Sequence, residues 1–464
     1  MTRSLRRRIW ESLAAMSFAR AVQVGYVFIL VPILLSQWGV EIYGEWLILS
    51  AIASFGALTN FGMFTASAVE ISLAVGAGDR ESASKISATA LAAGIAFVAA
   101  VLLMAWIGLS FVDPRVLLGV HAIPLHDVVV VTMLSLASVV LTVFVPVLSA
   151  PVSVTIGNAL ATVAAAIIRV VELIVIAGAV YAGGGPVSVA AVLVASVCLS
   201  ILVHVALARY WVPWLSLDLR RFDAATLRRL VRPSLAQFLL YISVNIFIIQ
   251  VPRIILGHMA GASAVAAFGV TVTYTRAART LATLFSQSLQ TETTRAYAEK
   301  RHDVVIHLTE GFCQTQLWAS LAAMVGLMLL GHPIFSIWTH GKIAFDFWLC
   351  LVLGIGFIIG AYGDAVLSVL LGINRILAPA LVHLCGTAVA VVLAVPAIAS
   401  FGVSGMAAVL VIPEILTAAV AVWVFCELLD LPLKAFVFQS VHWPVGLIRR
   451  ELDRLAGFLF KRTN

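Results

Sequence analysis

The chain has 464 residues, of which 62% are hydrophobic and only 11% are charged. An ordinary soluble domain is roughly half apolar and about a quarter charged, so this chain has too few polar groups to coat a soluble globule of its size. The apolar surplus predicts a polytopic membrane protein. In such a chain the net charge of +7 at pH 7 is expected to reflect the orientation in the membrane, and no nucleic-acid partner is expected.

Apolar stretches separated by Gly, Pro and charged residues predict about twelve transmembrane helices. A hydrocarbon core about 30 Å thick needs roughly 20 residues per helix, so twelve spans leave no room for a large extramembrane domain. The expected fold class is therefore all-α. In chain order the predicted helices are 14–38, 43–70, 87–111, 127–148, 157–182, 187–210, 234–258, 264–287, 308–331, 346–371, 379–400 and 403–428.

The distribution of Lys and Arg predicts the orientation in the membrane. The connections 112–126 and 332–345 carry only Arg115 and Lys342. Positive charge marks the cytoplasmic side, so these two connections are expected outside and both termini inside. On the predicted cytoplasmic side the basic residues lie in 1–8, 80–85, 209–232, 295–301, 375 and 434–462.

Two pieces of sequence recur at nearly the same offset. Val31-Pro32 in the first predicted helix returns as Val251-Pro252 in the seventh, and the pentapeptide 190–194 returns as 407–411. Because six is even, both halves would enter from the cytoplasm as parallel six-helix repeats around a central cavity. The predicted domains are an N-terminal six-helix bundle (1–210), a cytoplasmic linker with an amphipathic helix (211–233), a C-terminal six-helix bundle (234–430) and a basic amphipathic cytoplasmic tail (431–464).

Five arginines lie within predicted helices, where each costs about 2.5–3.5 kcal/mol near mid-bilayer unless it faces a cavity. Arg276 and Arg279 share one helix that contains no acidic residue. Arginine stays charged, and its planar fork binds phosphate oxygens, so this basic cluster predicts an anion-binding site. The other expected substrate-binding residues are Arg253, with Gln237, Tyr241 and Asn245 at four-residue steps before it, and Arg169 and Arg20.

Two of these arginines have alternative interpretations. Arg169 precedes Glu172 by three residues and could form an ion pair within its helix. Arg20 lies near the cytoplasmic end of the first helix and could extend to the inner headgroups.

Four acidic residues are candidates for ion coupling: Asp364, Glu414, Glu172 and Glu70. Buried carboxylates can exchange protons, and they can equally serve as counter-ions of the arginines. Both interpretations remain open at this point.

Metal and cofactor sites are not expected. The cysteines 198, 313, 350, 385 and 426 lie singly in apolar runs, and the histidine pairs 121/126 and 302/307 miss the i, i+4 spacing of a helical metal site. No Gly-rich nucleotide-binding loop is evident, so no ATP-driven mechanism is expected.

The stretch 30–46, LVPILLSQWGVEIYGEW, followed by Asn60-Phe61-Gly62-Met63, resembles the opening of oligosaccharide flippases of the Wzx O-antigen translocase type. These belong to the multidrug/oligosaccharidyl-lipid/polysaccharide exporter superfamily. The family pattern usually has Asp at the position of Asn60. Because this chain has Asn there instead, no acid is present to couple ion movement to transport. The resemblance implies that Asn60 contacts the substrate.

The resemblance implies a multi-pass protein of the bacterial cytoplasmic (inner) membrane that is not an enzyme. It would move an undecaprenyl-pyrophosphate-linked oligosaccharide, a surface polysaccharide repeat unit, between leaflets by alternating access. The implied partners are this lipid-linked substrate, membrane lipids, and polysaccharide polymerase and assembly proteins.

Two other functions are weighed against this one. A drug or organic-cation antiporter of the same superfamily would share the topology but should present acids to its substrate. A membrane polysaccharide polymerase or ligase would need catalytic groups in an outer loop, where Asp113, Asp127, His121 and His126 are the only acid–base cluster.

Overall fold

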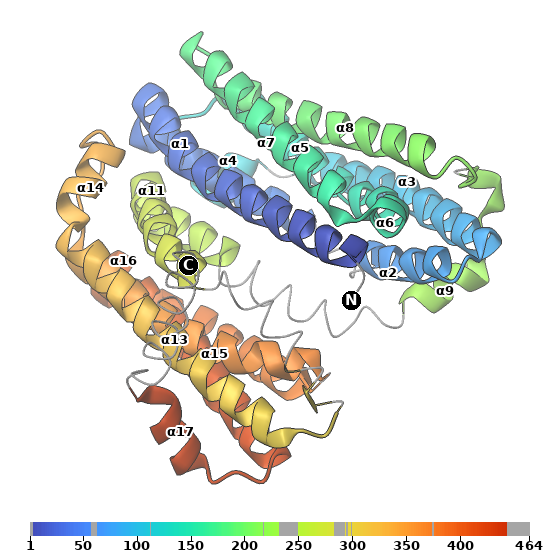
Figure 1. Cartoon of the computed structure of the whole chain (residues 1–464). Helices are drawn as coiled ribbons and strands as arrows, with labels where there is room; N and C mark the ends of the chain where they lie inside the picture. Colours follow the sequence, from blue (N-terminus) through green and yellow to red (C-terminus); the bar gives the residue numbers. More distant parts are fainter. Residues whose placement is uncertain are drawn as a thin grey trace, which may run out of the picture. The chain divides into compact units, whose positions relative to one another are not determined.

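The structure is a computed structural model that describes residues 3–56, 63–111, 113–216, 218–231, 249–282, 293, 296–297, 299–373 and 375–442. Within these ranges all regular secondary structure is helical (Figure 1). Within the described residues nine helical stretches are long and apolar enough to cross a membrane, when Leu125–Ile156 is counted as one stretch. The predicted all-α, polytopic fold class is confirmed.

The first half of the chain forms helices α1 to α8. Their bounds are α1 Arg3–Phe55, α2 Met63–Gly76, α3 Arg80–Phe111, α4 Pro114–Leu118, α5 Leu125–Leu141, α6 Phe144–Ile156, α7 Asn158–Tyr181 and α8 Pro186–Trp211.

The second half begins with a short helical turn, η2, and a short helix, α9. Both lie in the linker 211–233, where the sequence predicts an amphipathic helix. The bounds are η2 Leu219–Arg221, α9 Ala224–Val231, α11 Gln250–Ala282, α13 His302–Leu329, α14 Gly331–Trp338, α15 Phe347–Gly372, α16 Leu377–Leu428 and α17 Leu433–Val441.

Three long helices are each interrupted by one glycine, at the places where the sequence predicts a boundary between two spans. Gly39 interrupts α1, Gly261 interrupts α11 and Gly402 interrupts α16, all with positive φ. Only glycine adopts such backbone conformations without strain. Each of these helices therefore contains two helical segments.

Several predicted boundaries differ from those observed. The predicted helix 127–148 is divided into α5 and α6, because Pro146 has no N–H to bond the Thr142 carbonyl four residues earlier. The predicted helix 43–70 ends at Phe55 and resumes at α2, with 57–62 outside the described residues. The connection 332–345, predicted as a loop, contains most of α14.

The chain forms two compact units, which we call unit 1 and unit 2. Unit 1 comprises Met1–Val270 with Phe335–Ala344, and unit 2 comprises Thr271–Ile334 with Phe345–Asn464. This division falls within α11, whereas the sequence places the domain boundary at 211–233. The difference arises because the first part of α11 packs against α1, for example where Gly257 contacts Ile48.

Unit 1 is a bundle in which α1 packs against α7 and α5, α2 against α6, and α8 against both α5 and α7 (Figure 1). The connection after α8 returns to α3. There the Ser216 N–H donates to Ser84 Oγ at 3.2 Å, and Lys85 Nζ lies 3.3 Å from an Asp223 carboxylate oxygen. Asp223 also begins α9, because its carboxylate accepts the Thr226 N–H at 2.9 Å.

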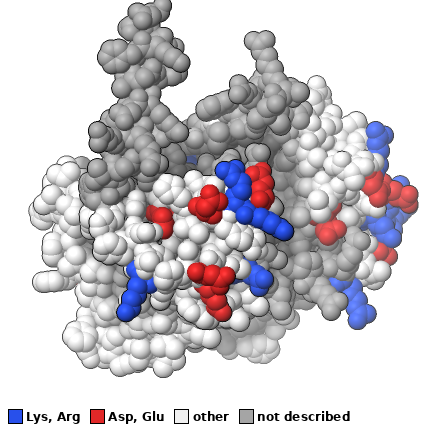
Figure 2. Space-filling model, turned by 60° about the horizontal axis from the view of Figure 1, so that its bottom comes forward, with Lys and Arg blue, Asp and Glu red and all other residues white. Residues whose placement is uncertain are grey.

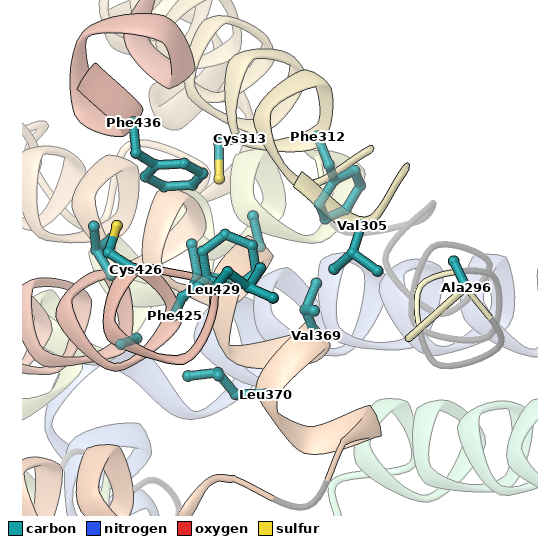
Figure 3. Packing of buried hydrophobic residues seen from close by; sticks show 14 residues of the cluster. Ala296, Val305, Phe312, Cys313, Val369, Leu370, Phe425, Cys426, Leu429 and Phe436 are labelled. Atoms are coloured by element: carbon teal, nitrogen blue, oxygen red, sulfur yellow. The ribbon is translucent and has the colours of Figure 1, made fainter. Parts of the chain in front are cut away.

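Unit 2 is centred on α13, α15 and α16, with α17 packed on α13. Figure 3 shows the core, in which Cys313, Val369 and Phe425 belong to one apolar cluster with Phe436 of α17. Helices in a membrane associate through close packing rather than through the hydrophobic effect, so small residues matter at their interfaces. On α15, Gly356 and Gly363 provide this close approach: an added Cβ would lie 3.2 Å from Val411 Cγ2 and 3.0 Å from Ala418 Cβ, respectively.

The outer surface is rich in large apolar side chains. Trp106 of α3 is 60% exposed and Trp348 of α15 is 68% exposed. On the face shown in Figure 2, charged side chains form small separate groups within a largely uncharged surface. Such surfaces fit a lipid environment.

Candidate functional sites in the two units

The central feature of unit 2 is an ion cluster built on Arg279. The Arg279 guanidinium donates to Asp364 Oδ2 through Nη2 at 2.7 Å and through Nε at 3.1 Å, and to Glu414 Oε1 through Nη1 at 3.0 Å. The three residues come from α11, α15 and α16. The side chains of Arg279 and Glu414 are 22% and 12% exposed.

This geometry corrects the expected purely basic cluster. The helix of Arg279 contains no acid, as the sequence indicates, but Asp364 and Glu414 reach it from two other helices. In the structure Asp364 and Glu414 are the ion-pair partners of Arg279.

A glycine makes room for the ion cluster. A Cβ added at Gly360 of α15 would overlap the Glu414 carboxylate and lie 2.9 Å from Arg279 Nη1. Gly360 therefore lets the charged groups of α11 and α16 reach the α15 backbone. The sequence does not distinguish Gly360 from other glycines of the spans, because the role of a glycine depends on which side chains approach it.

Arg276 lies one turn before Arg279 and shares an aromatic neighbour with it. The two guanidinium carbons are 6.0 and 5.9 Å from the centre of the Phe357 ring. These distances are at the outer limit of cation–π attraction. Both predicted arginines of this helix thus lie beside the same ring of α15.

His383 of α16 lies near the ion cluster. Its Nδ1 is 2.8 Å from Thr417 Oγ1, and Thr417 follows Glu414 by three residues. The ring is 6% exposed, and its Nε2 has no hydrogen-bond partner in the described part of the chain. In the sequence alone nothing distinguishes His383 from the other histidines.

Unit 1 contains a second ion cluster, centred on Glu172 of α7. Tyr26 Oη donates to Glu172 Oε1 at 2.6 Å, and Arg169 Nη1 donates to the same oxygen at 2.9 Å. Ser196 of α8 donates to Oε2. The ion pair within α7 is thus observed, and Glu172 is 4% exposed with both of its oxygens bonded.

Arg169 is held in place from two directions. Its guanidinium carbon is 4.4 Å from the centre of the Tyr26 ring, in addition to the bond to Glu172. Its side chain nevertheless remains 42% exposed. The guanidinium therefore keeps N–H groups available while its position is fixed.

This exposed side of Arg169 borders a cavity of about 420 Å³ within unit 1. The cavity lies among α1, α5, α6, α7 and α8. Its polar lining residues are Gln23, Thr142, Thr162, Arg169, Glu172, Ser196 and Ser200. The remaining lining is Ala, Val and Ile, so the cavity combines polar groups with apolar walls, as binding pockets do.

The other predicted site residues are not brought into these two clusters. Arg253 Nη1 donates to Gln250 Oε1 at 3.1 Å, and Gln250 Nε2 donates to Ser54 Oγ of α1 at 3.1 Å. Arg20 is exposed on α1, and Glu70 is partly buried on α2. Asn60, Gln237, Tyr241 and Asn245 lie outside the described residues.

Glu45 is a buried acid that sequence analysis did not select. Its carboxylate accepts the backbone N–H groups of His121, Ala122 and Ile123 at 2.5, 2.6 and 2.8 Å, and the residue is 1% exposed. Glu45 thus anchors the connection between α4 and α5. Of the acid–base candidates in this connection, Asp113 accepts a hydrogen bond from Arg115, and the His126 ring lies 3.2 Å from an Asp127 carboxylate oxygen.

No protein-family model matches the sequence, and no curated protein matches it. Solved structures do. A multidrug resistance MATE family transporter of the MOP superfamily in the inward-facing conformation matches with a TM-score of 0.67 at 18% identity, covering 91% of this chain and 95% of that one. Its outward-facing form matches at 0.63 with 17% identity, covering 92% of this chain and 96% of that one.

The lipid II flippase MurJ in an inward closed conformation also matches, with a TM-score of 0.67 at 13% identity, covering 96% of this chain and 93% of that one. At these identities the likeness establishes the fold. The chain is a multi-pass membrane protein with the fold of these transporters.

Proposed function

We propose that the protein is a flippase that moves an undecaprenyl-pyrophosphate-linked oligosaccharide across the bacterial cytoplasmic membrane by alternating access, with both termini in the cytoplasm. The fold shared with a lipid II flippase and with MATE transporters supports a transport role. The resemblance of residues 30–46 to the Wzx type supports this substrate class. Polysaccharide polymerase and assembly proteins would act on the delivered product.

The observation that carries the proposal is the position of Arg169 at the cavity of unit 1. A guanidinium cannot be deprotonated at physiological pH and binds phosphate oxygens with two parallel N–H groups. Tyr26 and Glu172 hold this group, while 42% of its side chain stays exposed. Carrying the pyrophosphate through hydrocarbon is the most costly part of the reaction, and Arg169 would offset that cost.

Arg276 and Arg253 are assigned supporting roles in holding the anionic headgroup or acidic sugars. Arg279 is assigned mainly to the ion cluster of unit 2, because two carboxylates bond its guanidinium and only 22% of its side chain is exposed, against 42% for Arg169 with its single carboxylate. Asn60, Gln237, Tyr241 and Asn245 remain proposed substrate contacts on the basis of the sequence.

The experiment that tests the proposal is flipping in proteoliposomes. A fluorescently tagged undecaprenyl-pyrophosphate oligosaccharide is incorporated, and its movement is followed by the fraction protected from a membrane-impermeant quencher. We expect Arg169→Gln to slow flipping about tenfold, the effect of losing one charge-assisted hydrogen bond, and Arg169→Lys to retain part of the rate.

The matched control is Arg209→Gln, which removes an exposed arginine from the last turn of α8. It should leave the rate unchanged. Equal rates for Arg169→Gln and the unmodified protein, at equal reconstituted amounts, would refute the role of Arg169. Failure of the unmodified protein to move the tagged lipid would refute the substrate class.

A drug or organic-cation antiporter is the second candidate. It is favoured by one observation, the pair of carboxylates Asp364 and Glu414 on neighbouring helices of unit 2. Such an antiporter should export a cationic dye against its gradient and lose this activity in Asp364→Asn or Glu414→Gln. Dye export without any flipping of the tagged lipid would favour this candidate over the flippase.

A further inference from the structure

Helix α1 contains a proline that leaves one of its own carbonyls without a partner. Pro32 has no N–H, so the carbonyl of Phe28, four residues earlier, loses its donor within the helix. The indole Nε1 of Trp338 donates to this carbonyl at 2.8 Å. The Trp338 ring also packs on Phe28, with ring centres 5.0 Å apart. Trp338 thus replaces the hydrogen bond that Pro32 removes.

A second side chain from the same segment bonds the end of the first part of α1. The helical backbone is interrupted at Gly39, and carbonyls at the end of a helical segment commonly accept hydrogen bonds from side chains. Lys342 Nζ donates to the Leu35 carbonyl at 2.7 Å and to the Ser36 carbonyl at 2.8 Å. An ammonium group at this end of a helix is also favoured by the helix dipole.

Both side chains belong to residues 335–344, which we call the clasp. The clasp is part of unit 1, although the chain on either side of it belongs to unit 2. A tight turn with positive φ at His340 and Gly341 gives it its shape, and the Thr339 hydroxyl donates to the Ile343 carbonyl at 3.2 Å. Phe335 is fully buried and secures its start.

The part of α1 just beyond the clasp is closely packed against α11. A Cβ added at Gly44 would overlap the Ala262 carbonyl, so the two backbones are in direct contact. Ala262 is 9% exposed. This contact and the clasp lie on either side of Gly39, in the region that the charge distribution predicts to face outward.

We propose that the clasp keeps the predicted outer end of unit 1 closed, and that its release from α1 is a step of the transport cycle; this rests on the proposed function. The clasp holds α1 through three side-chain hydrogen bonds to carbonyls, each of modest net strength, so the hold is specific and reversible. Because both ends of the clasp continue into unit 2, movement of that unit would act on these bonds.

The test measures, in the whole chain and without any substrate, how readily a reagent outside the membrane reaches the predicted outer end of unit 1. Ala262→Cys serves as the reporter, labelled in vesicles by a membrane-impermeant maleimide, and the background from native cysteines is measured in protein lacking the reporter. We expect Trp338→Phe, which loses one hydrogen bond, to raise the labelling rate about two- to tenfold by shifting an open–closed equilibrium. Lys342→Met loses two hydrogen bonds and should raise the labelling rate at least as much. Lys342→Arg should restore the slow rate.

Trp318→Phe is the matched control, because its indole donates to a different backbone carbonyl, that of Val441, at 3.1 Å within unit 2. It should leave reporter labelling unchanged. A second arm adds Pro32→Ala, which gives the Phe28 carbonyl a donor within the helix. In that background Trp338→Phe should raise labelling less than it does in the unmodified protein.

The outcomes separate the clasp from the proposed function. Unchanged labelling in Trp338→Phe and Lys342→Met would overturn the clasp, even if thermal stability falls, since a purely structural brace lowers stability without opening the outer end. Faster labelling together with no movement of lipid-linked oligosaccharide would support the clasp and refute the substrate class alone.

Discussion

Gly39 and Gly261 adopt the same unusual backbone conformation, with φ 81°, ψ 178° in α1 and φ 83°, ψ 172° in α11. Each follows a Val-Pro pair: Gly39 comes seven residues after Pro32, and Gly261 comes nine residues after Pro252. Equivalent breaks after equivalent pairs support the proposed duplication of the chain.

The first prediction concerns this conformation. It belongs to a region of φ/ψ space used essentially by glycine alone, and forcing another residue into it costs about 1–3 kcal/mol. No atom lies within 4 Å of a Cβ added at Gly39, so Gly39→Ala tests backbone strain without a clash. We expect a lower Tm of the purified protein.

Gly25→Ala is the control, because Gly25 also has open space around it and lies in regular helix. It should leave Tm unchanged or raise it slightly, since alanine favours helix. Equal Tm values for Gly39→Ala and Gly25→Ala would show that the break at Gly39 is not needed.

The second prediction concerns the ion cluster of unit 2. Arg279→Gln removes the shared cation of Asp364 and Glu414 and leaves two partly buried carboxylates uncompensated. Breaking such a cluster from one side typically costs about 3–5 kcal/mol, so Tm should fall strongly. Adding Asp364→Asn to Arg279→Gln should recover part of the loss. If the double variant is less stable than the single one, the acids are not counter-ions of Arg279.

The third prediction concerns Glu45. Glu45→Gln replaces one acceptor oxygen by a donor NH₂ group, which faces backbone N–H groups of residues 121–123. The loss of charge-assisted bonds should destabilise the protein by about 1.5–3 kcal/mol and raise amide hydrogen exchange in the α4–α5 connection. Glu41→Gln is the control: Glu41 is exposed on α1, and its replacement should change neither quantity.

The fourth prediction concerns pH. The Thr226 hydroxyl and backbone N–H donate to the Asp223 carboxylate and hold its pKa below the ordinary value, with a smaller contribution from Lys85. A depressed carboxylate pKa stabilises the folded state above the unfolded-state pKa of about 4, and this is lost as pH falls through the folded-state pKa. Asp223→Ala should therefore lower Tm at pH 7, and the difference from the unmodified protein should shrink below pH ~4.

Thr226→Val retains the carboxylate and one of its two donors from residue 226, so its effect at pH 7 should be smaller than that of Asp223→Ala. A Tm difference between the unmodified protein and Asp223→Ala that stays constant down to pH 3 would contradict the assignment.

Local patterns in the sequence predict most of the helical architecture. Apolar run length predicts the spans, and glycines such as Gly261 and Gly402 lie between predicted neighbours because a break there needs a residue without Cβ. The division between α5 and α6 was missed, since Pro146 lies inside an apolar run that otherwise continues unbroken.

The candidate site was predicted less completely. Arg169 with Glu172 could be paired because three residues along a helix bring their side chains together. The partners of Arg279 could not, because Asp364 and Glu414 are distant in sequence and reach it only through the packing of α15 and α16. Tyr26 and Ser196 could not be predicted as partners of Glu172 either, because both are distant from it in the sequence. Nothing in the sequence distinguishes them from other polar residues of the spans.

The ion cluster of unit 2 also has a consequence for biosynthesis. Arg279 emerges from the ribosome well before Asp364 and Glu414, so α11 enters the membrane carrying a charge whose counter-ions have not yet been made. Inserting such an arginine alone costs about 2.5–3.5 kcal/mol. The second part of α11 should therefore remain close to the insertion machinery until α15 and α16 arrive, which makes the last third of the chain a requirement for stable integration of its middle.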